Sequence, residues 1–354
     1  MPSKPTRVLI VDDSAVVRKL LGDALRREPD IEVVGGASDP FVAREMILKH
    51  RPDLITLDIE MPRMDGLSFL RRLMEHYPIP AIVVSSLTQS GSVASVEALR
   101  IGAIDVIAKP GGPQSVGQVT EKLVQRIRAL RAAPPIKLAR STASAAPAAA
   151  ASADAGRRAR GLIAIGASTG GTQALETVLT RLPADVPPIV IVQHMPAGFT
   201  NAFAARLNSV CALTVVEASG GEALERGMAY IAPGDHHMTV YQDGLRLRTR
   251  LTQSAPVHYQ RPAVDVLFGS VARLQSVAVV GLILTGMGAD GADGMVSMRQ
   301  AGALTIAEAE ESCVVFGMPK EAIARGGAVH VASLLQMPGL IFECFTRLDR
   351  RRVS

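Results

Sequence analysis

Residues 5–131 alternate short β-branched runs with longer amphipathic segments, and this alternation most narrows the folds open to the chain. The run at 7–11 precedes a segment in which apolar residues recur at helical spacing. Similar short runs follow at 31–34, 54–57, 81–84 and 104–107. The pattern predicts a five-stranded parallel sheet with helices between the strands, a flavodoxin-like doubly wound domain with its sites at the carboxyl ends of the strands.

Residues 132–160 interrupt this alternation. They are rich in alanine, serine and proline, and they offer almost no large apolar side chain for a core. Pro134, Pro135 and Pro147 would break the alternative structure, an alanine-rich helix. We therefore expect a flexible linker here.

A second α/β pattern occupies 161–350, which we expect to form a second doubly wound, mostly parallel domain. A hairpin is expected over 241–250, around Asp243 and Gly244. The other strands are expected at 161–166, 188–193, 213–217, 277–285 and 303–307.

Composition excludes several classes of protein. Hydrophobic residues make up 48% of the 354-residue chain and charged residues 20%, as in ordinary globular proteins. Lys and Arg (38) exceed Asp and Glu (33) by 5, but no aromatic residues alternate with these cations, so nucleic acid is not an expected partner. The 3 cysteines form no CxxC motif, which favours a reducing cytosol. Apolar runs are only strand-sized, so neither a signal peptide nor membrane insertion is expected.

Polar side chains stand where strands of the first domain are expected to end. Asp12 and Asp13 follow the first strand and Asp58 the third, so three carboxylates should converge at one edge of the sheet. Such a cluster repels itself unless a hard cation such as Mg²⁺ binds it through oxygen. Lys109 and Ser85, at two further strand ends, would place a cation and a hydroxyl over the same pocket.

A simpler interpretation is that Asp13 caps a helix and Asp58 begins a loop, both common roles for aspartate. The complete set, including the motif at 61–66 and Lys109 before Pro110, resembles the response-regulator receiver family.

That resemblance implies that Asp58 accepts a phosphoryl group from a histidine kinase. It also implies that Asp12, Asp13 and Asp58 hold Mg²⁺ together with the backbone carbonyl of Glu60. The resemblance also implies that Ser85 and Lys109 are the switch residues of the receiver domain. Residues 103–107 contain no aromatic residue for the family's aromatic switch, so output by docking on another domain stays open.

The second domain opens with a candidate nucleophile. Residues 166–170 satisfy G-x-S-x-G between an expected strand and an expected helix, with Ser168 at the centre. A serine on such a turn is exposed at the amino end of a helix, where backbone amides can stabilise an oxyanion. Gly-Ser-Thr turns also serve simply as helix caps, so the motif alone does not decide between the two.

His194 and Asp290 end two other strands of this domain. If their strands neighbour that of Ser168, His194 could act as general base and Asp290 could hold its imidazole in the useful tautomer. Position rather than residue type selects His194, because His236, His237 and His258 are rivals.

Residues 286–291 also satisfy the dinucleotide-binding pattern G-x-G-x-x-G, with Glu308 near the expected acidic position. That interpretation requires a βαβ unit at the start of its domain, whereas this motif lies near the end of the chain. It also leaves the turns at Ser168 and His194 unexplained, so we disfavour it.

Taken together, six segments resemble the chemotaxis protein-glutamate methylesterase family, CheB: 166–171, 193–196, 231–237, 260–268, 284–291 and 315–320. Receiver domain (5–131), linker (132–160) and methylesterase catalytic domain (161–350) occur in that family's order.

The resemblance implies that Ser168, His194 and Asp290 are nucleophile, base and orienting carboxylate. It places Thr169 and Met287 beside the substrate carbonyl, and it implies no cofactor in the esterase site. The chain order Ser, His, Asp differs from the Ser, Asp, His of α/β-hydrolases and indicates a separate fold.

The implied function is that of a phosphorylation-activated serine hydrolase. It demethylates glutamyl methyl esters, and deamidates glutamines, on methyl-accepting chemotaxis receptors, giving sensory adaptation. A chemotaxis histidine kinase is the implied phosphodonor, and the implied location is the cytoplasm, with recruitment to receptor arrays at the inner face of the membrane. A non-catalytic phospho-switched adaptor is the alternative, although it would not need all of Ser168, His194 and Asp290.

Overall fold

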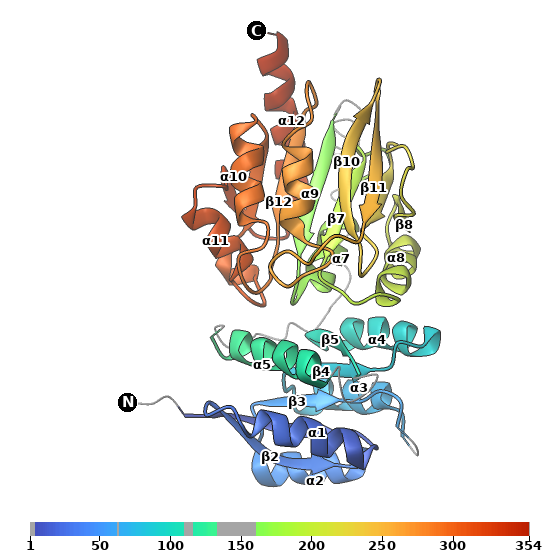
Figure 1. Ribbon diagram of the computed structural model, residues 1–354, viewed down its shortest axis with the longest axis vertical. Helices are drawn as coiled ribbons and strands as arrows, with labels where there is room; N and C mark the ends of the chain where they lie inside the picture. Colours follow the sequence, from blue (N-terminus) through green and yellow to red (C-terminus); the bar gives the residue numbers. More distant parts are fainter. Residues whose placement is uncertain (1–3, 62–63, 110–115, 133–160, 354) are drawn as a thin grey trace. The chain divides into compact units, whose positions relative to one another are not determined.

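The computed structural model describes residues 4–61, 64–109, 116–132 and 161–353 (Figure 1). The chain divides into two compact units, Met1–Arg140 and Ser141–Ser354. All but Ala132 of the segment predicted to be a linker, 132–160, lies outside the described residues.

The first unit is a doubly wound α/β domain. Its strands pair in parallel in the order β2-β1-β3-β4-β5. This is the flavodoxin-like order, as predicted. Its elements are β1 Thr6–Val11, α1 Ala15–Leu25, β2 Ile31–Ala37, α2 Pro40–His50, β3 Leu54–Leu57, α3 Gly66–His76, β4 Ala81–Ser85, α4 Gln89–Ile101, β5 Asp105–Ala108 and α5 Val116–Ala132.

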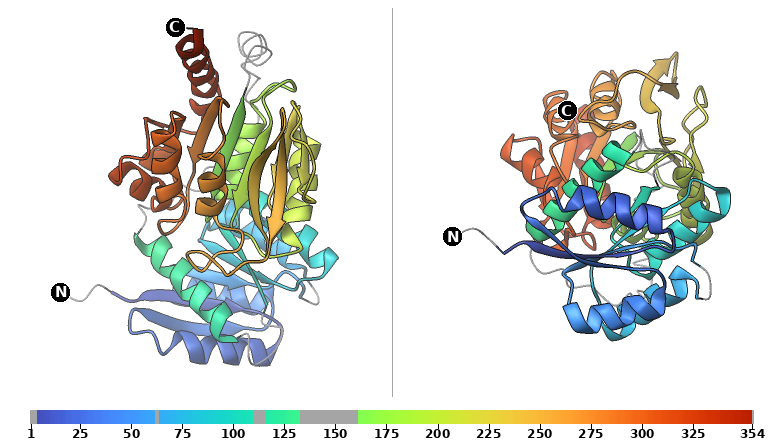
Figure 2. Two further views of the ribbon diagram at one scale, coloured as in Figure 1. Left: turned by 45° about the horizontal axis from the view of Figure 1, so that its top comes forward. Right: turned by 60° about the horizontal axis from the view of Figure 1, so that its bottom comes forward.

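Helices cover both faces of this sheet. α1 and α5 pack together on one face, and α2, α3 and α4 cover the other (Figure 2). Apart from the edge strand β2, the strands are nearly all buried, with Leu9, Ile55 and Val83 fully inaccessible. Burial on both faces explains why the strands appear in the sequence as continuous apolar runs rather than as alternating ones.

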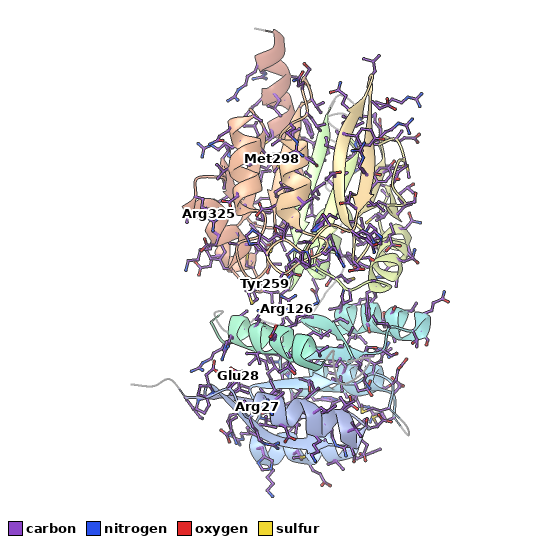
Figure 3. The ribbon with its side chains drawn as sticks, viewed as in Figure 1. Arg27, Glu28, Arg126, Tyr259, Met298 and Arg325 are labelled. Carbon is purple, nitrogen blue, oxygen red and sulfur yellow. The ribbon has the colours of Figure 1, made fainter. Side chains whose placement is uncertain are left out.

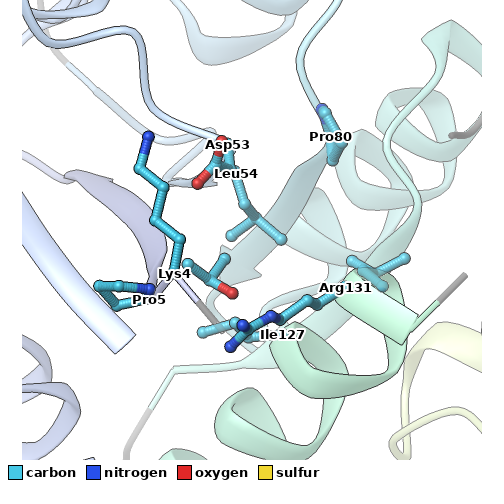
Figure 4. A pocket seen from close by; sticks show the side chains of 9 residues that line it. Lys4, Pro5, Asp53, Leu54, Pro80, Ile127 and Arg131 are labelled. Atoms are coloured by element: carbon cyan, nitrogen blue, oxygen red, sulfur yellow. The ribbon is translucent and has the colours of Figure 1, made fainter. Parts of the chain in front are cut away.

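A cavity of about 280 Å³ lies at the amino ends of β1 and β3, beside the end of α5 (Figure 4). It is lined by Thr6, Leu54 and Ile127, with Lys4 and Arg131 at its edge. The predicted phosphorylation pocket is at the carboxyl ends of the same strands, so this cavity is not part of it.

The second unit is also doubly wound, around a seven-stranded parallel sheet in the order β14-β13-β12-β6-β7-β9-β8. The strands and the separate two-stranded ribbon are β6 Leu162–Ala167, β7 Ile189–Gln193, β8 Thr214–Glu217, β9 Met228–Ile231, β10 His237–Asp243, β11 Arg246–Thr252, β12 Val279–Ile283, β13 Leu304–Glu308 and β14 His330–Ala332. The helices are α7 Gly171–Leu179, α8 Phe199–Val210, α9 Val264–Val271, α10 Ala292–Gln300, α11 Met318–Ala324 and α12 Met337–Val353, with the short 3₁₀ turn η2 Glu310–Ser312.

Two layers of helices enclose this sheet. α9, α10 and α11 pack on one face, with the β10–β11 ribbon against α9, while α7, α8 and α12 pack on the other (Figures 1 and 2). Phe268 of α9 and Met295 of α10 are fully buried in the core between helices and sheet. None of the described helices is both long and apolar enough to cross a membrane.

The hairpin runs from His237 to Thr252, longer than the predicted 241–250, and its turn lies one residue later than predicted. Asp243 pairs with Arg246, so the two-residue turn is Gly244 and Leu245. Gly244 has φ of +59°, a conformation that glycine adopts without a Cβ clash. The strands β9 and β14 were not predicted.

The strand order sets the position of the site. From β6 the chain winds through β7 towards β8 and β9 on one side, and then returns to build β12, β13 and β14 on the other. The order therefore reverses between β6 and β12. In open α/β sheets, ligands bind outside the carboxyl ends of the strands at such a switch point.

Candidate active site and phosphorylation site

Ser168 directly follows β6, at the switch point. Its backbone N–H donates to the Thr285 carbonyl, 3.0 Å away, which ties the turn to the end of β12. Its own carbonyl accepts from Gly171 N at 2.7 Å and from the Gln193 amide at 2.9 Å. The predicted strand–serine–helix arrangement is therefore present, with α7 beginning at Gly171.

Glycine is required at two positions around this serine. Gly170 has φ of +79°, and a Cβ there would lie 2.5 Å from Val314 Cβ. A Cβ on Gly286 would lie 2.7 Å from Ser168 Cβ. Real Cβ atoms do not approach neighbours so closely, so any larger residue would displace the turn that carries Ser168.

His194 directly follows β7, beside Ser168. β6 and β7 pair through Ala167 and Gln193, and the His194 N–H donates to the Ala167 carbonyl at 3.0 Å. The His194 side chain is almost fully buried, and its Nε2 lies 2.8 Å from Asp290 Oδ2. The structure thus brings together the His194 and Asp290 that the sequence selected from strand ends 96 residues apart.

Asp290 is held as a buried anion. Its oxygens also accept from the backbone N–H groups of Val264 (2.7 Å) and Asp265 (2.8 Å). Burial alone would raise the pKa of Asp290, but the hydrogen bond and charge of His194, with these two amides, outweigh it and lower the pKa. The carboxylate can therefore orient the imidazole and stabilise an imidazolium.

The contact to Asp290 uses Nε2 of His194 and thereby leaves Nδ1 as the nitrogen for proton transfer. The Ser168 hydroxyl is buried and has no hydrogen-bond partner among the described residues. Catalytic hydrogen bonds are often incomplete before substrate binds. The positions fit a base, but the structure contains no Ser168–His194 hydrogen bond.

Thr169 and Met287 occupy the two loops that flank Ser168. Thr169 is buried, and its carbonyl accepts from the Thr285 hydroxyl at 3.0 Å. Met287 is half-buried, and its backbone N–H makes no hydrogen bond to any other described residue. A backbone amide without a partner is available to donate a hydrogen bond to an oxyanion.

Glu308 does not support the dinucleotide alternative. Its side chain is completely buried and accepts from Thr285 N at 2.7 Å and from the Ser312 hydroxyl at 3.0 Å. A carboxylate that binds a ribose must face the ligand, whereas this one faces the protein interior.

The rival histidines have other partners. His237 is fully buried, accepts from Ala263 N through Nδ1 and lies 3.1 Å from the Ala255 carbonyl through Nε2, so it holds two loops together. His258 lies 2.9 Å from Asp265. Tyr259, next to it, is 89% exposed on the same loop (Figure 3).

Sequence reasoning missed the side chains that support the serine turn from behind, Gln193 and Thr285. Gln193 is buried directly before His194, and an amide at the end of an apolar strand was the one available signal. Nothing in the sequence indicated that Thr285 contacts Ser168 and Thr169, because the partners lie more than 100 residues away.

The carboxylates that were predicted to form a pocket in the first unit lie close together. Asp12, Asp13 and Asp58 each offer an oxygen within 4.8 Å of the others. Lys109 Nζ lies 2.7 Å from Asp58 Oδ2 and 3.3 Å from Asp12 Oδ2. Asp12 and Asp58 are buried and Asp13 is exposed.

Burial dominates the electrostatics of this pocket. It raises the pKa of Asp58 to about 6 and also raises that of Asp12, although the Lys109 ammonium lowers both. Burial by itself would lower the pKa of Lys109, but the two carboxylates raise it. The three clustered carboxylates offer the oxygen ligands that suit a hard divalent cation such as Mg²⁺.

The remaining predicted residues, Ser85 and Glu60, come from the end of β4 and the loop after β3. Ser85 is fully buried at the end of β4, its carbonyl accepts from Lys109 N at 2.7 Å, and its hydroxyl is 3.5 Å from the Gly91 carbonyl. Glu60 donates its N–H to Asp58, and its carboxylate accepts from Ser86 at 2.7 Å. Ser86, a second hydroxyl, therefore lies beside Glu60.

The two units together define a class of protein: a response regulator whose effector half is built as a serine hydrolase. Family models agree with each half. Residues 8–121 match the response regulator receiver domain, and residues 163–341 match the CheB methylesterase.

The chain belongs to the CheB methylesterase family. It is 52% identical to a protein-glutamate methylesterase/protein-glutamine glutaminase of Syntrophus aciditrophicus, covering 93% of this chain and 96% of the relative. It is 50% identical to another protein of that name from Cupriavidus metallidurans, covering 95% of each. The crystal structure of the Thermotoga maritima CheB methylesterase catalytic domain matches with a TM-score of 0.51 and 41% identity, covering 52% of this chain and 98% of that one.

Proposed function

We propose that this chain hydrolyses glutamyl methyl esters, and deamidates glutamines, on chemotaxis receptors, with Ser168 as nucleophile, His194 as base and Asp290 as orienting carboxylate. One observation supports the assignment most strongly. The buried His194–Asp290 pair, 2.8 Å apart, lies beside Ser168 at the switch point of the sheet.

The reaction proceeds in two halves. His194 takes the Ser168 hydroxyl proton through Nδ1 while Oγ attacks the γ-carbonyl carbon of the ester. The tetrahedral intermediate collapses, and His194 returns the proton to the departing methoxide, which leaves as methanol. Water then adds to the glutamyl ester of Ser168, with His194 again as base, and releases the glutamate carboxylate and free serine. With glutamine, ammonia leaves in place of methanol.

Asp290 and the loop amides lower the barrier of this sequence. The carboxylate fixes the imidazole through Nε2 and stabilises its charged form. The Met287 amide, with Thr169 next to the nucleophile, stabilises the oxyanion of the tetrahedral intermediate.

The receiver unit supplies the regulation. Asp58 accepts the phosphoryl group. Asp12, Asp13, Asp58 and the carbonyl of Glu60 would hold Mg²⁺, which would neutralise phosphoryl charge when bound. Lys109 and Ser85 respond to the modified carboxylate. Phosphorylation then shifts the population towards the state in which the serine site is accessible.

The partners follow from the family. Methyl-accepting receptors are the substrates, and a chemotaxis histidine kinase is the phosphodonor. We place the protein in the cytoplasm, recruited to receptor arrays at the inner face of the membrane, because the modified glutamates and the kinase must both be reached from there.

The test is methanol and ammonia release from methylated and amidated receptor membranes by wild type, Ser168→Ala and a matched surface control, Ser209→Ala. Ser209 is exposed on α8, so its variant reports the effect of removing a hydroxyl elsewhere. Loss of both products in Ser168→Ala alone supports the proposal. Equal release by the two variants would refute the serine mechanism and leave the non-catalytic adaptor.

A further inference from the structure

Thr285 contacts both residues of the nucleophile turn. Its carbonyl accepts from Ser168 N at 3.0 Å, and its hydroxyl donates to the Thr169 carbonyl at 3.0 Å. The same hydroxyl accepts from Val315 N at 2.9 Å. One fully buried side chain thus connects the turn that carries Ser168 with the segment after η2.

Glu308 holds Thr285 from the other side. Its Oε2 accepts from the Thr285 N–H at 2.7 Å, and its Oε1 accepts from the Ser312 hydroxyl at 3.0 Å. Glu308 is the last residue of β13 and is completely inaccessible to solvent. A buried carboxyl group is costly unless it is hydrogen-bonded, and these two bonds offset that cost.

The position of this pair relates it to catalysis. Bonds from Glu308 to Thr285, and from Thr285 to Ser168 and Thr169, form a continuous chain from β13 to the nucleophile turn. Backbone displacement of the turn by a fraction of an ångström would move Ser168 Oγ relative to His194. Small errors of placement at a reacting atom cost large factors in rate.

We propose that Thr285 and Glu308 are positioning residues that fix the Ser168–Thr169 turn against His194 for attack on the ester. Neither touches substrate. Burial raises the pKa of Glu308 to about 7, with bonds from Thr285, Ser312 and Cys313 opposing and the nearby Glu311 adding to the rise.

An ordinary structural role for Thr285 makes a different prediction, and the chain contains a matched control. Thr305 on β13 is also fully buried, and its hydroxyl donates to the Gly327 carbonyl and accepts from Val329 N at 3.1 Å. It makes the same kind of two-sided bond on the next strand, but it contacts neither Ser168 nor Thr169. Thr→Val at either position removes one hydroxyl at nearly constant volume.

The experiment compares Thr285→Val, Thr305→Val and Thr285→Ser in the full-length protein, using kcat and KM for methanol release and the midpoint of unfolding. We expect both valine variants to lose a similar amount of stability. Thr285→Val should lower kcat by about tenfold or more with KM within about twofold, and Thr285→Ser should restore most of it. Equal kcat values for the two valine variants would overturn the proposal.

Glu308 is tested by Glu308→Ala and Glu308→Gln. The alanine variant leaves the Thr285 N–H unpaired, and we expect kcat to fall by about tenfold or more. Glutamine keeps an oxygen for that N–H and should restore most of the loss. If Glu308→Ala does not fold, the test is the kcat of Glu308→Gln relative to wild type. A fall in kcat as large as that of Thr285→Val would contradict the positioning role.

The proposal rests on the proposed function, and the assay separates the two. If wild type releases no methanol, or if Ser168→Ala releases as much as wild type, the serine mechanism fails. If release depends on Ser168 but Thr285→Val behaves like Thr305→Val, only the positioning role fails.

Discussion

Replacing Glu308 by glutamine should change how the stability of the second unit depends on pH. Glu308 is completely buried, and its carboxyl oxygens accept from Thr285 N and Ser312 Oγ. Glutamine has nearly the same shape, and its oxygen can accept the Thr285 N–H. The Ser312 hydroxyl also lies 3.2 Å from the Ala309 carbonyl, so it can donate there and accept from the new amide. The substitution therefore removes a titratable group with few other changes.

The magnitude follows from the pKa of Glu308, which burial raises from 4.5 to about 7. Below pH 4.5 the group is protonated in both the folded and unfolded chain, so it contributes no pH dependence. Between these values the unfolded chain releases the proton first, so rising pH lowers the stability of wild type. Each pH unit is worth about 1.4 kcal/mol, which gives a loss of about 3 kcal/mol by pH 8.

Scanning calorimetry of the full-length protein can measure this loss of stability at each pH. The transition of the second unit is identified as the one that Glu308→Gln shifts. The stability gain of Glu308→Gln over wild type should grow by about 3 kcal/mol between pH 4.5 and 8. Glu343→Gln, which removes an exposed carboxyl group of α12, is the control and should show no such growth. A gain that stays constant with pH would refute the reasoning, because Glu308 would then ionise as easily in the folded protein as in the unfolded one.

Three further predictions concern the two sites. Asp290→Asn should lower kcat by about 10²- to 10⁴-fold with little change in KM, measured by methanol release, since asparagine cannot accept all three bonds or stabilise an imidazolium. EDTA should abolish phosphorylation by a small-molecule phosphodonor, and added Mg²⁺ should restore it, as measured by intact-protein mass; label that persists in EDTA would contradict the metal site. Gly286→Ala should lower kcat by about tenfold or more, because its Cβ would lie 2.7 Å from Ser168 Cβ, whereas Gly244→Ala, with nothing near its Cβ, should leave kcat unchanged.

Much of the fold could be predicted because parallel sheets bury both faces. Strands such as β1, β3, β7 and β12 appear in the sequence as short continuous apolar runs, and the polar residue after each run marks a carboxyl end. The three-residue strand β14 is too short to give such a signal. β9 is as long as β3, so its length does not explain why it was missed. The turn of the hairpin shifted by one residue because both Asp-Gly and Gly-X sequences suit two-residue turns.

The residues of the site also include some that the sequence could predict and some that it could not. Ser168, His194 and Asp58 could be predicted because each directly follows a strand, and topology gathers strand ends. Asp290 lies further on, in the loop between β12 and α10, but that loop starts at the same edge of the sheet. Glu308 also ends a strand, but its direction, inward to Thr285 rather than outward to a ligand, depends on side-chain packing that the sequence does not display.

The central claim is that Ser168 performs an ester hydrolysis that Asp58 controls. The most direct measurement is the initial rate of methanol release from methylated receptor membranes by wild type, Ser168→Ala and Asp58→Asn, each with and without a small-molecule phosphodonor. The account predicts that the phosphodonor stimulates wild type alone, that Asp58→Asn keeps only the unstimulated rate, and that Ser168→Ala is lower by a factor of order 10³ or more. Release that survives in Ser168→Ala, or stimulation that survives in Asp58→Asn, would contradict it.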